Sequence, residues 1–341
     1  MFYNDKWQLF SVSFNRYLSI RITRFRKAYL TGQHQETMNY NHLFSKIYDE
    51  LGKTDDSGEV ASYIPELKNI NPNKFGVHLT TLDGGHYSFG DSDEKFSIQS
   101  IAKVLALVLA YQLENENLWD RVGVEPSGTP FNSLVQLEYD KGIPRNPLIN
   151  AGALIISDIL VSHFDEPKKQ FIEFVRKVSG LPEMDYSTRI ANSEKSAGYT
   201  NAALVNLMKS FGNIRNDVDE VLDFYFNLCS IEMTCKELSR TFLFLADYGV
   251  CPFKNEPIIS TSKSKRINAI MQLCGFYDEA GEFSFKVGLP GKSGVGGGII
   301  AIHPDKYSIA VWSPRLNKKG NSIRGMKFLE LFTSETQASI F

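Results

Sequence analysis

A serine and a lysine lie three residues apart in a strongly apolar segment, at Ser100 and Lys103. On a helix, side chains at this spacing share a face. A serine hydroxyl becomes a nucleophile when a base takes its proton, and a lysine can be that base when burial lowers its pKa toward neutrality. The pair fits acyl-transfer chemistry. It also fits an ordinary helical serine beside a solvated lysine.

A glycine-rich segment, residues 288–298, carries a second lysine–serine pair that begins at Lys292. A phosphate-binding loop would need a glycine five residues before Gly291, and that position holds Lys286. A helix should also follow such a loop, whereas residues 299–302 have the composition of a strand. The better interpretation is a strand whose glycines let a substrate approach the backbone, with N–H groups available to an oxyanion. A purely structural glycine-rich bend is the alternative.

Taken together, the two segments show an S-x-x-K motif followed much later by K-S-G. This pairing resembles that of penicillin-recognising serine enzymes, which are acyl-transfer enzymes. The separation of Ser100 from Lys292 fits two ends of a sheet that close around a helix.

The elements that must position these residues follow from periodicity. Apolar side chains at helical spacing predict helices, alternation with turn residues between predicts two hairpins, and no internal repeat is found. The expected helices span 43–51, 97–113, 170–178, 202–211, 218–228, 236–248 and 326–332, and the expected strands span 76–81, 86–89, 298–302 and 307–312. Strands at both ends with helices between predict an α+β fold: a mainly antiparallel sheet flanked by helices, with an inserted helical subdomain.

The composition of the chain argues against three classes of function: nucleic-acid binding, membrane insertion and metal binding. The 341 residues carry a net charge of −2, which argues against a nucleic-acid-binding surface. The longest apolar runs, 104–110 and 151–156, are far shorter than the roughly 20 residues of a membrane-spanning helix. The four cysteines have no C-x-x-C spacing and there is no H-E-x-x-H motif, so we expect reduced thiols, no metal and a cytoplasmic location.

Residues 1–37 differ from the rest of the chain. They hold six basic and two acidic residues and no continuous apolar core of a secretory signal. We expect a basic N-terminal extension, or a chain whose true start is Met38, in preference to a transit peptide. The expected catalytic domain spans 38–341.

The sequence around these motifs resembles the serine-dependent glutaminase family, collinearly from about residue 41 to 332. Seven blocks carry the resemblance: Tyr63-Ile64-Pro65, Phe96–Lys103, Asn146–Ala153, Ser193-Glu194 with Gly198 and Asn201, Leu222–Glu232, Cys274–Asp278 and Gly288–Gly298. The resemblance implies a serine β-lactamase/transpeptidase-like fold, no cofactor, and hydrolysis of L-glutamine to L-glutamate and ammonia. It also implies a homo-oligomer, a dimer or tetramer.

Carried over position by position, the resemblance implies Ser100 as nucleophile, Lys103 as its base, and the N–H groups of Ser100 and Val295 as the oxyanion hole. Tyr225 could pass a proton between Lys103 and the leaving ammonia. The implied pocket for glutamine consists of Tyr63, Ser100, Asn150, Glu194, Asn201, Tyr225, Tyr277 and Val295. A buried Glu194 would pair the substrate ammonium, and asparagine amides and tyrosine hydroxyls would bind its carboxylate.

Three positions depart from the family pattern: Ala102, Ala197 and Thr200 stand where serine, serine or threonine, and arginine are common. None removes a proposed catalytic group. Two other functions remain open, a β-lactamase-like or peptidase-like acyl transferase and a catalytically inactive binding module. No convincing S-D-N element supports the first, and the intact Ser100, Lys103 and Lys292 argue against the second.

Overall fold

The computed structural model describes residues 38–52, 57–128 and 132–341. By its contacts the chain divides into two compact units, residues 1–40 and residues 41–341. Of the first unit only residues 38–40 are described, and they lead into helix α2 (Tyr40–Leu51). The expected extension, residues 1–37, lies outside the described residues.

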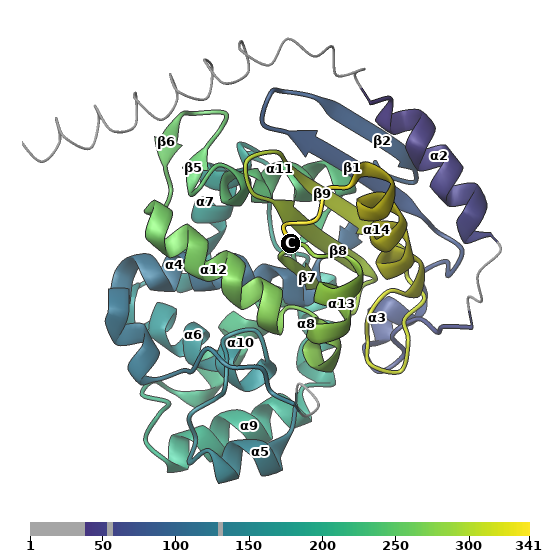
Figure 1. The fold of residues 1–341 in the computed structure, drawn as a ribbon. Coiled ribbons are helices and arrows are strands. Elements are labelled where there is room, and N and C mark those ends of the chain that lie inside the picture. Colours follow the sequence, from purple (N-terminus) through teal and green to yellow (C-terminus); the bar gives the residue numbers. More distant parts are fainter. Residues whose placement is uncertain (1–37, 53–56, 129–131) are drawn as a thin grey trace, which may run out of the picture. The chain divides into compact units, whose positions relative to one another are not determined.

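Five strands from the two ends of the chain form one antiparallel sheet (Figure 1). These are β1 (Gly76–Thr81), β2 (His86–Gly90), β7 (Gly291–Ser293), β8 (Gly298–His303) and β9 (Tyr307–Trp312), in the order β2-β1-β9-β8-β7. The two ends meet where β1 pairs with β9, with Val77 opposite Val311. This arrangement confirms the predicted antiparallel sheet and its two hairpins.

Successive side chains of a strand alternate between the two faces of the sheet, and those of β8 and β9 are buried on both faces. One face carries His78 and Thr80, which hydrogen-bond Ser239 of helix α11 (Cys235–Ala246) across 2.8 Å each. The other face carries Tyr307, whose ring lies 5.8 Å from that of Phe332 in helix α14 (Ile323–Thr336). Helices therefore cover both faces, as predicted.

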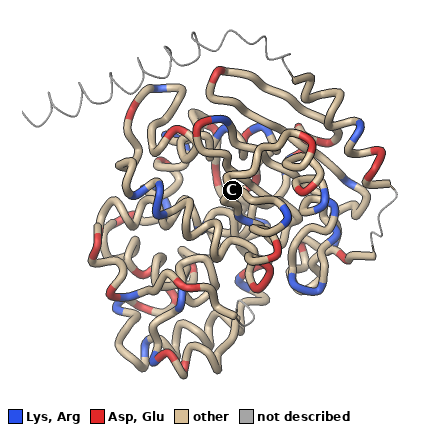
Figure 2. The backbone as a smooth tube through the Cα atoms, viewed as in Figure 1, with Lys and Arg blue, Asp and Glu red and all other residues tan. Residues whose placement is uncertain are grey.

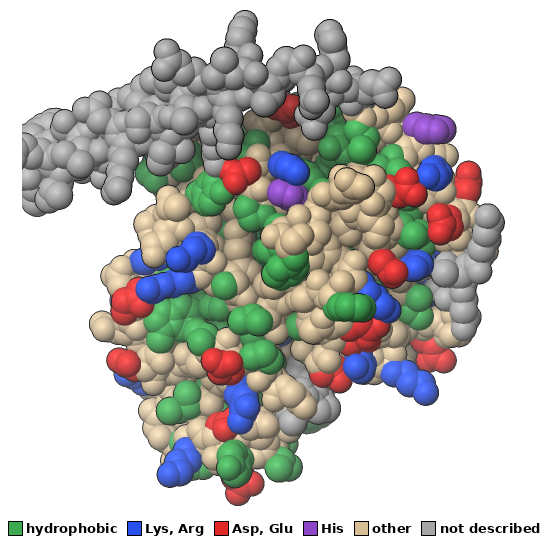
Figure 3. Space-filling model, viewed as in Figure 1, with side chains coloured by type: hydrophobic (Ala, Val, Ile, Leu, Met, Phe, Trp, Pro, Cys, Tyr) green, Lys and Arg blue, Asp and Glu red, His purple; other side chains and the backbone are tan. Residues whose placement is uncertain are grey.

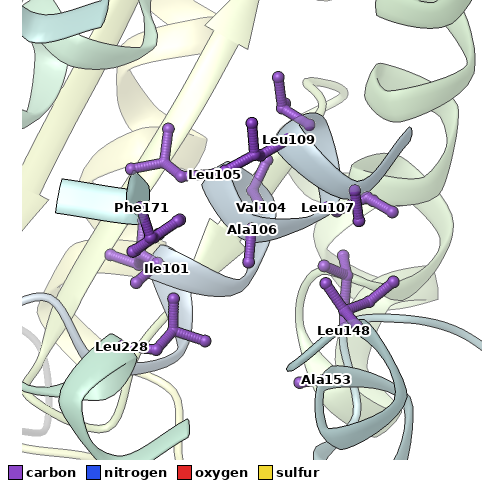
Figure 4. Packing of buried hydrophobic residues seen from close by; sticks show 14 of the residues in the cluster. Ile101, Val104, Leu105, Ala106, Leu107, Leu109, Leu148, Ala153, Phe171 and Leu228 are labelled. Carbon is purple, nitrogen blue, oxygen red and sulfur yellow. The ribbon is translucent and has the colours of Figure 1, made fainter. Parts of the chain in front are cut away.

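Helix α4 (Ala102–Glu114) runs through the core, and Figure 4 shows its apolar side chains packed among Leu148, Phe171 and Leu228. Residues 102–111 are all buried. The predicted start of this helix at Ser97 is wrong. Residues 96–97 form strand β3 (Phe96–Ser97), paired with β4 (Glu232–Met233), and a 3₁₀ turn η1 (Gln99–Ile101) precedes the helix.

Most remaining helices lie between β2 and β7 in the sequence, as predicted. Four of the predicted helices are found as α7 (Pro167–Ser179), α9 (Tyr199–Ser210), α10 (Val218–Cys229) and α11. Besides β3, η1 and β4, the elements that periodicity missed are α3 (Pro65–Lys68), η2 (Asn115–Asp120), α5 (Leu134–Tyr139), α6 (Asn150–His163), α8 (Thr188–Ser196), β5 (Val250–Cys251), β6 (Glu256–Pro257), α12 (Thr261–Cys274), η3 (Tyr277–Glu279) and α13 (Ala280–Lys286). Figure 1 shows α5, α6, α9 and α10 grouped beside the sheet, which is the predicted helical insertion.

Charges of both signs are spread along the described chain (Figure 2), and they are interspersed with apolar side chains on the face shown in Figure 3. Among the described helices, none combines the length and the apolar character needed to cross a membrane.

Candidate functional site

The backbone turns sharply just before Ser100. Ile98 N–H donates to the carbonyl of Ile231 across 3.0 Å, which continues the β3–β4 pairing, and Gln99 then adopts φ 48°, the left-handed region. That conformation is unusual for a residue with a Cβ and is often found at functional sites. Ser100 follows in η1 with 8% of its surface exposed. The turn therefore places its hydroxyl ahead of the helix that carries Lys103.

Lys103 lies in the first turn of α4 with 1% of its surface exposed. Its Nζ donates to Oδ1 of Asn150, a neutral amide, across 2.7 Å. Burial lowers the pKa of Lys103 to about 8, while the nearby Cys229 and Glu194 oppose this shift. A lysine of this kind is poised to exchange a proton near neutral pH.

The glycine-rich turn between β7 and β8 packs directly on the segment before Ser100. A Cβ at Gly294 would lie 2.5 Å from the carbonyl oxygen of Ile98, and one at Gly296 would lie 2.2 Å from that of Ser97. Only glycine permits such an approach. Val295, between them, lines the pocket beside Ser100, and its N–H makes no backbone hydrogen bond within the described residues.

Two asparagines join the helical region to Lys103. Asn150 is the first residue of α6, and its Nδ2 donates to Oδ1 of Asn201 in α9 across 2.9 Å. Because its oxygen accepts from Lys103, the Asn150 amide is oriented by both neighbours. The Nδ2 of Asn201 is therefore the group left for a ligand in this pair.

Glu194 brings a buried carboxylate to the same pocket from α8. Only 8% of its surface is exposed, and its Oε1 has no hydrogen-bond partner within the described residues. Burial raises the pKa of Glu194 to about 7, and the Gln99 amide and Lys103 oppose this rise. An unpaired buried carboxylate is costly, so this group favours a cationic ligand.

Three tyrosines complete the wall. Tyr63 precedes α3 and is 57% exposed, whereas Tyr225 of α10 and Tyr277 of η3 are buried. Burial raises the pKa of Tyr225 well above its usual value and that of Tyr277 to about 12, and the nearby hydroxyl groups of Ser100 and Ser293 oppose the rise at Tyr277. Both hydroxyls therefore keep their protons in the resting site and can donate as well as accept.

These residues border one pocket with a volume of about 840 Å³. Eight of the nine residues chosen from the sequence line it: Tyr63, Ser100, Asn150, Glu194, Asn201, Tyr225, Tyr277 and Val295. Lys103 does not line the pocket and reaches it through Asn150. The predicted set is thus brought together from η1, η3, the β7–β8 turn, the segment before α3 and the five helices α4, α6, α8, α9 and α10.

Two further lining residues, Gln99 and Cys229, were not singled out from the sequence. Both lie next to predicted residues, Gln99 before Ser100 and Cys229 one turn after Tyr225, but their side chains carry no spacing signal. Lys292 of the K-S-G motif is fully buried, donates to the carbonyls of Gly275 and Ser293 across 3.1 and 2.6 Å, and lies 4.4 Å from the Tyr277 ring centre. Lys292 therefore packs against the Tyr277 ring without lining the pocket itself.

Comparisons with known proteins agree with this geometry. The sequence profile of the family Glutaminase matches residues 58–341. A glutaminase of Saccharophagus degradans is 59% identical over 306 residues, which are 90% of this chain and 100% of that protein. A glutaminase of Christiangramia forsetii is 58% identical over 304 residues, 89% of this chain and 100% of that protein.

Solved structures give the same result. The structure of the probable glutaminase ybaS matches with a TM-score of 0.83 at 33% identity, over 88% of this chain and 97% of that one. The structure of Mglu in its tris and glutamate form matches with a TM-score of 0.82 at 29% identity, over 88% of this chain and 67% of that one. The expected β-lactamase-like fold is confirmed, and the chain belongs to the glutaminase family.

Proposed function

We propose that the chain hydrolyses L-glutamine to L-glutamate and ammonia through an acyl-enzyme on Ser100, with Lys103 as the base. The observation that carries this proposal is the fully buried Lys103 with a pKa lowered to about 8, next to the pocket that Ser100 lines. Neutral Lys103 takes the proton of the Ser100 hydroxyl as Oγ attacks the side-chain amide carbon. The C–O bond forms and the carbonyl oxygen becomes an oxyanion.

The oxyanion is stabilised by the N–H groups of Ser100 and Val295, the second of which has no other backbone partner in the described chain. The tetrahedral intermediate then breaks its C–N bond. The leaving nitrogen receives the proton held by Lys103, passed on by the Tyr225 hydroxyl, and departs as ammonia. Nζ of Lys103 lies 5.7 Å from the centre of the Tyr225 ring, and Tyr225 lines the pocket beside Ser100, so the two side chains are neighbours at the site.

Water completes the cycle. It gives a proton to neutral Lys103 and attacks the ester carbon of the acyl-enzyme, and the intermediate collapses with return of that proton to Ser100 Oγ. The products are glutamate and the free serine. The structure of the relative Mglu is described as a glutamate form, which supports a pocket that accepts this product in the family.

We assign substrate selection to Glu194, Asn201 and the tyrosines. The unpaired carboxylate of Glu194 suits the α-ammonium of free glutamine, and the free amide nitrogen of Asn201 suits its α-carboxylate. An analogue without the α-ammonium would leave Glu194 without its partner, and one without the α-carboxylate would leave Asn201 without its partner. Because these groups are shielded from water, such analogues should be rejected.

The direct test is ammonia release from glutamine by the purified wild-type chain and by Ser100→Ala. We expect the variant to keep its fold and to lose at least about three orders of magnitude in kcat, since a nucleophile is removed. Circular dichroism and thermal unfolding check the fold. A variant that retains more than about a tenth of the wild-type kcat would exclude Ser100 as the nucleophile.

We also propose a cytoplasmic homo-oligomer, a dimer or tetramer. Large apolar side chains on α5, Val135 and Tyr139, are 78% and 80% exposed and would gain from burial against another copy. Sedimentation velocity of the purified protein measures the assembly, and cell fractionation measures the location.

A further inference from the structure

Helix α6 begins without a capping side chain. The residue at its N-cap is Ile149, which has no side-chain oxygen to accept a hydrogen bond from the first turn. Asn146 acts instead, just before the helix: its Oδ1 accepts from the N–H groups of Leu148 and Ile149, across 3.0 and 3.1 Å. The Asn146 side chain therefore closes a turn on its own backbone and sets the path by which the chain enters α6.

The other end of the Asn146 amide is held as well. Its Nδ2 donates to the carbonyl of Glu125 across 2.9 Å, and beside it the N–H of Glu125 donates to the carbonyl of Arg145 across 2.9 Å. Because a carbonyl can only accept and an N–H can only donate, these partners fix which way the Asn146 amide faces. Only 1% of the Asn146 surface is exposed, so water does not compete for these hydrogen bonds.

A glycine lets this turn pack directly on the first turn of α6. A Cβ at Gly152 would lie 1.9 Å from the carbonyl oxygen of Asn146 and 2.8 Å from Cα of Pro147. Both are backbone atoms, which cannot move aside as the end of a flexible side chain could. The turn at residues 146–149 and the start of α6 therefore form one closely packed unit, in which the position of the turn determines the position of the helix start.

Asn150, the first residue of α6, joins this unit to the candidate site. Its Oδ1 accepts from Nζ of Lys103 across 2.7 Å, and its Nδ2 donates to Oδ1 of Asn201 across 2.9 Å. Hydrogen bonds of this kind are made up to about 3.2 Å, so a displacement of the helix start by about 1 Å is enough to lose the contact with Lys103. The acceptor of the Lys103 amine thus depends on the turn that Asn146 closes.

We propose that Asn146 is a positioning residue, which holds the first turn of α6 in place so that the Asn150 amide can hold the Lys103 amine. The inference rests on the proposed function and adds to it a residue that does not line the pocket. Its effect is therefore on the rate of the chemical step and on the titration of Lys103, and less on glutamine binding.

The experiment compares Asn146→Ala, Asn146→Ser and Asn150→Ala with the wild type. Glutamine kinetics from about pH 6 to 9 give kcat, KM and the acidic limb of the kcat profile, and thermal unfolding gives the fraction folded at the assay temperature. Alanine removes both ends of the Asn146 amide, whereas serine keeps an oxygen that can accept from an N–H farther along the chain and close the turn.

Asn268→Ala is the matched control. Asn268 is also buried, donates from Nδ2 to the carbonyl of Leu245 across 3.2 Å and does not line the pocket. This variant therefore removes a buried amide and its hydrogen bond at a distance from α6. It should lower the melting temperature and leave kcat and the acidic limb unchanged.

We expect Asn146→Ala to lower kcat about tenfold, with KM changed by less than about threefold. The acidic limb of the kcat profile should move to lower pH, because an ammonium that has lost its acceptor is less stable. With glutamine bound, Glu194 is paired with the substrate, so this limb reports Lys103. Asn146→Ser should lower kcat by less than about threefold with a limb shift in the same direction, and it carries the test if the alanine variant does not fold.

The double variant tests the route through Asn150. Asn150→Ala by itself should lower kcat and move the limb as Asn146→Ala does. Adding Asn146→Ala to Asn150→Ala should lower kcat by less than about twofold further, because the group through which Asn146 acts is gone.

A wild-type kcat in the Asn146 variants would overturn the inference, and so would a lowered kcat with an unmoved limb. An equal loss of kcat with and without Asn150, or an equal loss in Asn268→Ala, would also overturn it, because either indicates a general effect on the fold. Failure of the proposed function looks different. In that case the wild type releases no ammonia, or Asn150→Ala itself leaves kcat and the limb unchanged, and the inference falls with it.

Discussion

Nζ of Lys103 donates to Oδ1 of Asn150 across 2.7 Å, and this contact joins the first turn of α4 to the first residue of α6. The partner is a neutral amide, so no carboxylate at this position holds the lysine in its charged form. The apolar side chains around α4, seen in Figure 4, keep water away from it. The pair therefore places a lysine with a lowered pKa where the nucleophile needs a base.

The pH dependence of glutamine hydrolysis should reflect this environment. The pKa of Lys103 is lowered to about 8 and that of Glu194 is raised to about 7. Lys103 must lose its proton to act as a base, and Glu194 must lose its proton to pair an ammonium. Both conditions are met only as pH rises, so kcat/KM should increase between pH 6 and 9. A pH–rate profile of the purified enzyme measures this.

Asn150→Asp tests whether the pKa near 8 in the pH–rate profile belongs to Lys103. A carboxylate beside Nζ stabilises the ammonium and raises the pKa of Lys103. The acidic limb of the kcat profile should therefore move to higher pH, while Asn150→Ala, which adds no charge, should not move it in that direction. A limb that stays in place in Asn150→Asp would show that another group controls it.

The glycine-rich turn provides a second prediction. A Cβ at Gly296 would lie 2.2 Å from the backbone oxygen of Ser97, which cannot yield without moving the segment before Ser100. Gly296→Ala should therefore displace Val295 and lower kcat by about 100-fold, the scale expected for a lost oxyanion donor. It should also lower the melting temperature.

Gly281→Ala is the control for this substitution. Gly281 lies in α13, and a Cβ there would meet nothing within 4 Å. Alanine in a helix should stabilise the fold by about 0.5–1 kcal/mol without a change in kcat. If Gly296→Ala were as active and as stable as Gly281→Ala, the close contact with Ser97 would not be needed.

Much of the fold could be predicted from the sequence, because hairpins and amphipathic helices leave a local signal. A sheet built from both ends of the chain followed from the apolar strands there, whereas the pairing of β1 with β9 is known from the structure. The start of α4 was missed, because Phe96–Ser97 forms a strand only through its partner β4, far away in the sequence. The short polar helix α8, which carries Glu194, has no long apolar face that periodicity could detect.

The candidate site was predicted from blocks of resemblance, and its wall residues lie together. The supporting residues could not be predicted in the same way. The left-handed backbone at Gln99 depends on the packing of the glycine-rich turn against it. The contacts of Glu279 with Asn317 and Asn321 join residues about 40 positions apart, and asparagine and glutamate at those positions look like ordinary loop residues.

The expected extension, residues 1–37, gives a third prediction. From the change in composition near Met38, we propose that these residues are an accessory to the catalytic domain. A chain that begins at Met38 should be soluble, with the same kcat/KM for glutamine as the full chain. Expression of both chains and glutamine kinetics check this. An insoluble or inactive shorter chain would show that residues 1–37 contribute to the fold.

The last prediction concerns specificity for free glutamine. The Glu194 carboxylate is buried, and its Oε1 has no partner in the described residues, so the substrate's α-ammonium is its natural counterion. Glu194→Gln keeps the shape and removes the charge. We expect KM for glutamine to rise on the order of 100-fold, about 2.7 kcal/mol, with a smaller change in kcat, because the ammonium is held equally in the ground and transition states.

N-acetyl-glutamine supplies the matching change in the substrate, since acetylation removes the positive charge and adds bulk beside it. The wild type should hydrolyse it poorly, because binding would leave Glu194 buried without a cation. The exposed Glu183 provides a control variant, Glu183→Gln, which should behave as the wild type on both compounds. If the wild type hydrolysed N-acetyl-glutamine nearly as fast as glutamine, Glu194 would not recognise the ammonium, and the roles of Asn201 and Tyr277 in the pocket would have to be reassigned.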